Sequence, residues 1–304
     1  MGMFDVSDKP DTLRVAVAQA VVNVNCETIA LVRAGQSPKG DIAEAARIAA
    51  TMAAKKTSDI IPYCHPIPID YIRVEVVLKE RTIEVSAEVK TVWKTGVEME
   101  ALTAASVGAL TIYDMLKPVD ETLSIGSVTL LRKSGGMKSF KERYSRQLKA
   151  AVLVVSDSVA RGDRVDGSGK LALERLEANG FGVDVYKVVP DEVELIEAEL
   201  KRFCDELELD LVVSCGGTGL GPRDVTVDAT LRVVQKEVRG VSDAIWAYGQ
   251  RRTPLAMLSR GVCGVRGHTV IVNFPGSPKA VLEGFDALFP GILHVYRMFE
   301  GLGH

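Results

Sequence analysis

The chain has 304 residues, of which 47% are hydrophobic, and a formal net charge of −3; it is therefore long enough for two domains and lacks the basic excess that nucleic-acid binding usually needs. No apolar run approaches the roughly 20 residues of a membrane span, and the first residues have neither the basic nor the apolar region of a signal peptide. The five cysteines are scattered without a CxxC pair, which argues against zinc or a disulfide framework, so we expect a cytoplasmic protein with no nucleic-acid and no membrane partner.

The first third of the chain predicts one strand and one helix. Residues 14–24 alternate well enough for a half-buried strand. A turn follows at residues 36–40, and Asp41 is suited to cap a helix that continues to Lys55. One face of this helix is rich in alanine, so we expect it to approach a sheet or another helix closely.

The rest of the first half predicts three more strands and a second helix. Residues 71–79 and 82–92 alternate clearly and are joined by a tight turn at residues 80–81. A helix over residues 98–117 ends at a proline, and a last strand covers residues 123–131. The order β-α-β-β-α-β is that of the split β-α-β unit, which predicts an α+β ferredoxin-like N-terminal domain.

Three motifs in this half carry titratable side chains. His65 lies in a segment stiffened by three prolines, which suits acid–base chemistry but also a structural histidine. Glu98 and Glu100 stand at a helix start, where the helix dipole favours acids in any case. Asp114 and Lys117 share a helix face. They form either an ordinary surface pair or, if buried, a lysine poised for proton transfer or phosphate contact.

Long motifs in the first half resemble one family. The segments KGDIAEAARIAATMAAKKTSDIIPYCHPIPI, KTGVEMEALTAASVGALTIYDMLK and LLRKSGG look like the cyclic pyranopterin monophosphate synthase (MoaC) family of molybdenum cofactor biosynthesis. The resemblance extends from Asp5 to about Gly136. It implies that cyclic dihydroguanosine triphosphate is rearranged to cyclic pyranopterin monophosphate with loss of pyrophosphate, without a tightly bound cofactor. It also implies hexamers in which the site is completed across a subunit interface.

The same resemblance implies roles for individual residues. Lys117, paired with Asp114, is expected to be the leading acid–base group, with Lys39 as a second lysine near the reacting phosphate. The residues expected to be catalytic are Lys39, His65, Glu98, Glu100, Asp114 and Lys117, and those expected to bind substrate are Arg14, Lys55, Cys64, Met99 and Lys133. One departure from the family is Met137-Lys138 after Gly136, where a lysine usually follows the glycines directly.

Residues 138–149, KSFKERYSRQLK, are basic and have little apolar periodicity. This composition predicts a solvated linker that lets two domains assemble semi-independently. The predicted domains are therefore residues 1–137 and residues 150–304.

Strands and helices alternate through the second half of the chain. Buried-strand patterns occur at residues 150–156, 183–189, 211–214 and 269–274, and helices are predicted at residues 168–179, 190–207, 226–238 and 243–248 and from Lys279. This alternation predicts an α/β doubly wound, mainly parallel sheet. Because ligands bind such sheets at the carboxyl ends of the strands, the loops after these four strands are expected to converge on one edge.

A glycine-rich turn follows the strand at residues 211–214, with glycines at positions 216, 217, 219 and 221. Without Cβ atoms its N–H groups can close on a phosphate, and the next helix start adds positive potential. The alternative is a tight turn without a ligand. Asp191 and Asp224 are candidate Mg²⁺ ligands, because Mg²⁺ takes one or two carboxylates plus substrate phosphates. Each is also suited to an ordinary helix cap or turn.

The motifs VVSDS, VVPDE, SCGGTGLGPRDVTVDAT and VNFPGSPKAV resemble the molybdopterin adenylyltransferase family (MogA/MoaB), which is related to a domain of gephyrin. The resemblance implies a trimer in which molybdopterin attacks the α-phosphate of ATP, with Mg²⁺ and ATP as cofactors. Asp191 and Asp224 match the catalytic and metal-associated aspartates. The residues expected to bind substrate are Ser156, Asp157, Gly216, Gly217, Thr218, Gly219, Gly276, Ser277 and Pro278.

We therefore interpret the sequence as a bifunctional enzyme of molybdenum cofactor biosynthesis, a lyase fused to a nucleotidyltransferase. Its expected partners are cyclic dihydroguanosine triphosphate, molybdopterin and ATP. A threefold axis is common to both families, so a homo-oligomer, either a trimer or a hexamer, is expected. The alternative is that the C-terminal domain binds or scaffolds molybdopterin without catalysis.

Overall fold

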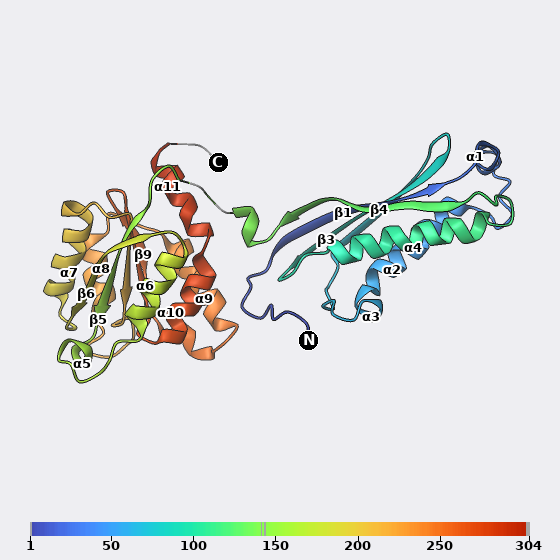
Figure 1. The fold of residues 1–304 in the computed structure, drawn as a ribbon. Coiled ribbons are helices and arrows are strands. Elements are labelled where there is room, and N and C mark those ends of the chain that lie inside the picture. Colours follow the sequence, from blue (N-terminus) through green and yellow to red (C-terminus); the bar gives the residue numbers. More distant parts are fainter. Residues whose placement is uncertain (1, 141, 143, 302–304) are drawn as a thin grey trace. The chain divides into compact units, whose positions relative to one another are not determined.

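Figure 1 shows the computed structural model of the chain, which describes residues 2–140, 142 and 144–301, without the side chain of residue 138. The chain divides into two compact units, Met1–Ser139 and Phe140–His304. Each unit is described by itself. Within the described residues, no helix is long and apolar enough to cross a membrane.

The N-terminal unit is a four-stranded antiparallel sheet with two long helices on one face (Figure 1). Its strands are β1 (Thr12–Asn23), β2 (Tyr71–Leu78), β3 (Thr82–Trp93) and β4 (Ser124–Gly135), in the order β2-β3-β1-β4. Its helices are α1 (Cys26–Arg33), α2 (Ile42–Lys55), α3 (Thr57–Ile60) and α4 (Glu98–Leu116). Because β1 lies between β3 and β4, each β-α-β connection passes over an intervening strand.

Small residues bring the helices of this unit close to its sheet. A Cβ added to Gly108 of α4 would meet Val85 Cγ1 at 2.8 Å and Ala50 Cβ at 3.4 Å. The close approach expected from the alanine-rich helix is therefore confirmed. Its start is confirmed as well, because the side chain of Asp41 accepts from the backbone N–H groups of Ala43 and Glu44.

The C-terminal unit is a six-stranded sheet covered by helices. Its strands are β5 (Lys149–Val155), β6 (Gly182–Val189), β7 (Leu211–Cys215), β8 (Lys236–Glu237), β9 (Cys263–Arg266) and β10 (Thr269–Phe274), in the order β6-β5-β7-β10-β9-β8. The contacts of β5 with β6 and β7, and of β7 with β10, are parallel, and β9 and β8 form an antiparallel edge. The helices are α5 (Asp157–Ala160), α6 (Ser168–Ala178), α7 (Val193–Lys201), α8 (Thr226–Val233), α9 (Arg239–Gln250), α10 (Pro278–Leu288) and α11 (His294–Phe299). Short helical turns are η2 (Arg202–Glu206), η3 (Pro254–Leu258) and η4 (Gly291–Leu293).

Both faces of this sheet are buried, as a doubly wound fold requires. Successive residues of β5 belong to different cores: Ala150, Val152 and Val154 pack in one, and Ala151, Leu153 and Val155 in the other. In Figure 1, α6 and α10 lie on one side of the sheet and α7 and α8 on the other. The predicted α/β doubly wound, mainly parallel class is confirmed.

Several predicted boundaries in this unit are wrong. The helix expected over residues 226–238 ends at Val233, because the chain then becomes extended and β8 pairs with β9. The helix expected over residues 243–248 begins earlier, at Arg239. Strands β8 and β9 were not predicted, since two and four residues are too short to establish a period.

The predicted linker is wrong in its second half. Arg146 donates to both carboxylate oxygens of the buried Asp210, at 2.7 and 2.5 Å, and Leu148 is 6% exposed. The ring of Tyr144 packs edge-on against Tyr296, with centroids 6.0 Å apart. The linker's first residues lie in a 3-10 helix, η1 (Met137–Phe140), and residues 141 and 143 lie outside the described part. Residues 144–148 are thus anchored to the C-terminal unit by aromatic packing and by an ion pair with the buried Asp210.

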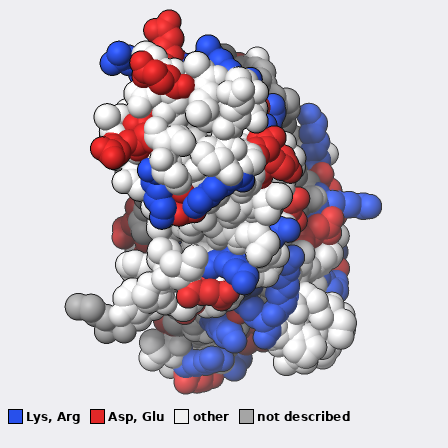
Figure 2. Space-filling model, turned by 90° about the vertical axis from the view of Figure 1, so that its right-hand side faces the viewer, with Lys and Arg blue, Asp and Glu red and all other residues white. Residues whose placement is uncertain are grey.

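Figure 2 shows basic and acidic side chains mixed over one face of the molecule, with broad uncharged areas between them. This mixture agrees with the nearly balanced charge of the sequence.

Candidate active sites

Basic side chains surround one cavity of the N-terminal unit. The pairing of β1 with β4 brings Arg14 and Lys133 to a cavity of about 480 Å³, which Lys9 and Glu98 also line. Lys133 Nζ lies 3.4 Å from Glu98 Oε1. Met137, at the position where the MoaC family usually has lysine, borders the same cavity. Three cations around one acid suit a polyanionic ligand.

A buried carboxylate stands beside Cys64 at the start of α4. Glu100 is 2% exposed, its Oε1 accepts from Cys64 Sγ at 3.5 Å, and its Oε2 has no partner among the described residues. Burial raises the pKa of Glu100. Burial, together with the neighbouring Glu100, raises the pKa of Cys64 to about 11. His65 Nε2 hydrogen-bonds with the carbonyl oxygen of Phe4 at 2.8 Å, and the side chain of Met99 is partly exposed.

Asp114 holds two lysines at the other end of α4. Lys39 Nζ lies 2.7 Å from Asp114 Oδ2, and Lys117 Nζ lies 2.8 Å from Asp114 Oδ1. Hydrogen bonds from Lys117 and Lys39 lower the pKa of Asp114 to about 2, and the hydrogen bond to Asp114 raises the pKa of Lys117. All three side chains are exposed, so Asp114 and Lys117 form a surface ion pair in this chain and not a buried one. Lys117 is therefore protonated at neutral pH and is an acid in this state.

The site residues predicted for this unit form two groups at opposite ends of α4. Glu100 and Asp114 are about 14 residues apart on that helix, or roughly 21 Å at its rise per residue. Helix α2 runs antiparallel to α4. Lys39, just before α2, binds Asp114 near the end of α4, and Ala50, later in α2, lies beside Gly108, which comes earlier in α4. Lys55 at the end of α2 thus belongs to the Glu100 end. A single chain does not bring Lys117 to Glu100.

In the C-terminal unit, the glycine turn after β7 needs glycine for two separate reasons. Gly216 and Gly217 have φ of +105° and +63°, conformations that other residues rarely adopt. A Cβ on Gly216 would also collide with the carbonyl oxygen of Val155, and one on Gly217 with Thr226 Oγ1. Gly276, after β10, lies against Gly216, so this loop packs directly on the turn.

The turn presents a row of backbone N–H groups. Among the described residues, the N–H groups of Gly217, Thr218, Gly219 and Leu220 donate to no other protein group, whereas that of Gly221 donates to Asp224 Oδ2 at 2.8 Å. Successive free N–H groups in such a turn make an anion-binding concavity. This feature favours the phosphate-binding alternative over a turn without a ligand.

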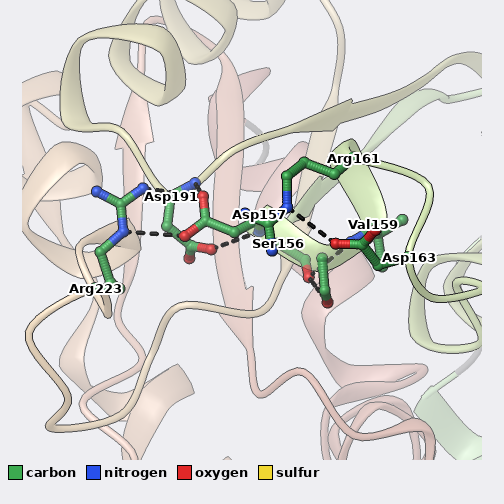
Figure 3. A network of polar contacts seen from close by, with 8 residues as sticks. Ser156, Asp157, Val159, Arg161, Asp163, Asp191 and Arg223 are labelled. Carbon is green, nitrogen blue, oxygen red and sulfur yellow. Dashed lines mark hydrogen bonds and ion pairs between the residues drawn. The ribbon is translucent and has the colours of Figure 1, made fainter.

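Figure 3 shows Asp157 and Asp191, which follow β5 and β6, joined by two reciprocal hydrogen bonds. Asp157 N–H donates to Asp191 Oδ2 at 2.8 Å, and Asp191 N–H donates to Asp157 Oδ1 at 3.1 Å. Arg223 donates to both oxygens of Asp157, at 2.9 and 3.0 Å, which lowers the pKa of Asp157. Burial first, and then the charges of Asp157 and Asp224, raise the pKa of Asp191.

The predicted convergence of loops on one sheet edge is confirmed. A cavity of about 330 Å³ is lined by Ser156, Asp191, Gly216, Gly217, Asp224, Gly276 and Pro278, together with the loop of residues 164–168. Within the described residues, no cluster of three metal-ligating side chains is present. A cation here would therefore have protein ligands from Asp191 and Asp224 and would need further ligands from a substrate.

Some predicted binding residues have other partners. The hydroxyl of Ser156 accepts from Val159 N–H and that of Ser277 from Ala280 N–H, so both cap helices. Thr218 is 4% exposed, and its hydroxyl accepts from Ser259 Oγ at 3.1 Å. Ser277 lines a neighbouring apolar pocket of about 270 Å³, with Trp246 and Leu255.

Sequence reasoning missed two residues that shape this cavity. Asp166 is buried and accepts from Ser168 Oγ, Gly169 N–H and the hydroxyl of Tyr186. Burial would raise the pKa of Asp166, but these hydrogen bonds hold it below its ordinary value. Arg260 binds the glycine turn from far along the chain. The Asp-x-Ser-Gly spacing at residue 166 is a turn signal that could have been noted; nothing in one sequence marks Arg260.

Comparisons with known proteins agree with this division. Residues 3–136 match the MoaC family, and residues 151–294 match a family described as a probable molybdopterin binding domain. A molybdenum cofactor biosynthesis bifunctional protein of Chlorobaculum tepidum is 42% identical over 99% of this chain and 96% of its own length. A protein of the same description from Synechococcus elongatus is 35% identical over 99% of this chain and 98% of its own length. The cyclic pyranopterin monophosphate synthase of Thermomicrobium roseum is 51% identical over 49% of this chain and 91% of its own.

Among solved structures, the molybdopterin biosynthesis enzyme MoaB of Thermus thermophilus is 41% identical, with a TM-score of 0.49 over 51% of this chain and 98% of that chain.

The N-terminal unit thus matches the MoaC family, and the C-terminal unit matches the family described as a probable molybdopterin binding domain. The chain belongs to the family of bifunctional proteins of molybdenum cofactor biosynthesis.

Proposed function

We propose that the N-terminal unit converts cyclic dihydroguanosine triphosphate to cyclic pyranopterin monophosphate and pyrophosphate, and that the C-terminal unit transfers the adenylyl group of Mg-ATP to molybdopterin. The first activity is that named for relatives 51% identical to this unit. The second is carried by one observation: Asp191 and Asp224 share a cavity with a turn in which the N–H groups of residues 217–220 have no partner among the described residues.

The charge of the N-terminal cavity supports the first reaction. Arg14, Lys133 and Lys9 would hold the triphosphate, because three cations compensate the charge that accumulates on it and on the leaving pyrophosphate. Glu100, whose pKa is raised by burial, would carry a proton to or from the ring. Lys117, whose pKa is raised by Asp114, would act as the acid that protonates the substrate.

This chemistry requires a second copy of the chain. The group at Asp114 is roughly 21 Å from Glu100 along α4, beyond the reach of one substrate's reacting atoms. We propose that Lys39, Asp114 and Lys117 of one copy complete the cavity of another in a homo-oligomer, a trimer or hexamer. We also assign the N-terminal fold to the ferredoxin-like class on its strand order and its two crossovers.

The C-terminal cavity has the donors and acceptors that a magnesium nucleotide needs. The N–H groups of residues 217–220 would bind phosphate oxygens, and Asp191 and Asp224 would hold Mg²⁺. Asp191 suits this role, because its carboxylate lies among like charges that a divalent cation would relieve. When bound, Mg²⁺ would neutralise charge on the phosphates and polarise the phosphorus under attack.

Two cavities meet at one loop, which suits a reaction with two substrates. Gly276 and Pro278 line the polar cavity, and Pro275 and Ser277 line the apolar pocket with Trp246. We propose that the phosphates of ATP occupy the polar cavity and that a flat ring occupies the apolar pocket. Adenylyl transfer then rests on holding the two substrates in line while the pyrophosphate charge is neutralised.

The test is to assay each reaction separately on the intact chain. Purified chain should form cyclic pyranopterin monophosphate from its triphosphate precursor, and should release pyrophosphate from ATP only when both Mg²⁺ and molybdopterin are present. A chain that binds molybdopterin but never releases pyrophosphate would be a scaffolding module, and the adenylyl-transfer proposal would then fail. A monomeric mass by light scattering would refute the shared N-terminal site.

A further inference from the structure

Arg260 reaches the glycine turn from 41 residues further along the chain. Its Nε donates to the carbonyl oxygen of Gly219 at 2.9 Å, and its Nη2 donates to the carbonyl oxygen of Asp224 at 2.6 Å. Its own backbone N–H donates to the carbonyl oxygen of Thr218 at 2.8 Å. Arg260 thus binds both sides of the loop that carries Asp224 and the N–H groups of residues 217–220, which have no partner among the described residues.

These contacts fix the direction of the peptide groups. In a trans peptide, the carbonyl of one residue and the N–H of the next point to opposite sides. Because the carbonyls of Thr218 and Gly219 face Arg260, the N–H groups of Gly219 and Leu220 point away from it. Within the glycine turn, they are two of the four N–H groups that have no partner among the described residues. By binding the carbonyl oxygens of Thr218 and Gly219, Arg260 therefore directs the N–H groups of Gly219 and Leu220 to the other side of the loop.

The guanidinium is itself held in place. Asp228, in the first turn of α8, accepts from Arg260 Nη1 at 3.3 Å and from Nη2 at 3.0 Å. This hydrogen-bonded pair raises the pKa of Arg260. The neighbouring Ser259 adds a hydrogen bond to the hydroxyl of the buried Thr218. The contacts form one network from α8 through Arg260 to the turn.

We propose that Arg260 is a positioning residue for the phosphate site: it touches no substrate, and it sets the direction of the Gly219 and Leu220 N–H groups and the place of Asp224. The assignment rests on the proposed Mg-ATP site of this unit. Lysine is a poor substitute in this role, because three separate acceptors need the planar fork of donors that only arginine has.

Arg266 provides a matched control in the same unit. It too donates to both oxygens of an aspartate, Asp205, at 2.8 and 2.7 Å, and to a helix carbonyl, that of Val233, at 3.1 Å. It lies outside the lining of the cavity. Replacing either arginine by methionine removes a similar set of hydrogen bonds while keeping most of the apolar stem. Only the change at Arg260 should disturb the turn.

The experiment follows amide hydrogen exchange of the intact chain over residues 217–224, with and without Mg-ATP and without molybdopterin. In wild-type chain, Mg-ATP should slow exchange of the amides at 217–220. Arg260→Met should raise the ATP concentration for half-maximal protection by about tenfold or more, equivalent to about 1.4 kcal/mol. Arg260→Lys should recover only part of this loss, and Arg266→Met should titrate like the wild type.

A second readout needs no ligand. In the free chain, the amides of Gly221 and Asp224 hydrogen-bond within the loop, and they should exchange at least about tenfold faster in Arg260→Met, with no change in Arg266→Met. Equal exchange in wild type and Arg260→Met, or the same acceleration in Arg266→Met, would overturn the assignment. Protection by Mg-ATP without pyrophosphate release when molybdopterin is added would refute the proposed transfer and leave the role of Arg260 standing.

Discussion

The backbone N–H groups of Asp157 and Asp191 each donate to the other residue's carboxylate, at 2.8 and 3.1 Å. This reciprocal pair ties the end of β5 to the end of β6 and fixes the direction of the Asp191 side chain. It also places two acids side by side, of which only Asp157 accepts hydrogen bonds from an arginine within the described residues. The hydrogen bonds from Arg223 lower the pKa of Asp157, whereas burial raises the pKa of Asp191.

Asp224→Asn should lower Mg²⁺-dependent pyrophosphate release by about two orders of magnitude or more, because the change removes one charge from the proposed Mg²⁺ site. The amide oxygen can still accept from Gly221 N–H, so the turn should keep its shape. Molybdopterin binding, measured by calorimetry, should be unchanged. The matched control is Asp184→Asn, at an exposed aspartate of β6 that pairs with Lys149. Full activity in Asp224→Asn would contradict the proposal that Asp224 binds Mg²⁺.

Asp191→Asn should stabilise the C-terminal unit near pH 8 and have less effect near pH 4. The pKa of Asp191 is raised in the folded chain, so its contribution to stability is present below the unfolded pKa and is lost as pH rises through the folded pKa. The amide mimics the protonated form at every pH. A midpoint increase of roughly 1–4 °C at pH 8 is expected, read from Trp246 fluorescence in a Trp93→Phe background.

The same midpoint difference at both pH values would show that ionisation of Asp191 costs nothing in the folded chain. The variant should also lose Mg²⁺-dependent turnover, because the amide cannot replace the carboxylate at the cation.

Gly217→Ala should abolish Mg-ATP binding, and Gly267→Ala is its matched control. Both glycines have positive φ, +63° and +58°, so an alanine at either has a similar backbone cost of roughly 1–2 kcal/mol. A Cβ at Gly217 would in addition collide with Thr226 Oγ1 and meet Asp191 Oδ1 at 3.1 Å, whereas one at Gly267 would meet nothing within 4 Å. Equal thermal midpoints and equal ATP affinities in the two variants would contradict the collision.

Asp114→Asn should move the alkaline limb of cyclic pyranopterin monophosphate synthesis to lower pH. Asp114 raises the pKa of Lys117, so the lysine should lose its proton earlier once the carboxylate is gone. Lys117→Ala should stop product formation with little change in thermal midpoint, because its side chain is exposed. An unmoved alkaline limb in Asp114→Asn would mean that another group sets it. Lys79→Ala, at an exposed lysine of the β2–β3 turn, is the control.

Local patterns predicted the regular elements well. Strict alternation in β2 and β3 and the capping aspartate before α2 each depend on neighbours a few residues apart. The pattern failed where an element was too short to show a period, as in β8, or where a distant partner decided the outcome. Residues 144–148 looked solvated because the buried Asp210 and the ring of Tyr296, which hold them, lie far along the chain.

The residues of the candidate sites also differ in whether a local pattern or a distant contact identifies them. Gly216, Asp191 and Asp224 could be found because strand ends and turns mark them locally, and the sheet then brings their loops to one cavity. Arg260 could not be found, because its contacts with Gly219 and Asp224 join residues 41 and 36 positions apart in the chain. The division of the N-terminal residues into two groups was also hidden, since the sequence gives spacing along α4 but not the partner that faces each end.

The length of α4 has a genetic consequence. Since the Glu100 group and the Lys117 group belong to opposite ends of one rigid helix, a chain damaged at one end still carries an intact other end. If two copies build each site, inactive Glu100→Gln chains mixed with inactive Lys117→Ala chains should regain activity by subunit exchange, because some sites then receive an undamaged half from each parent. Two alleles, each inactive by itself, would complement one another in the same cell.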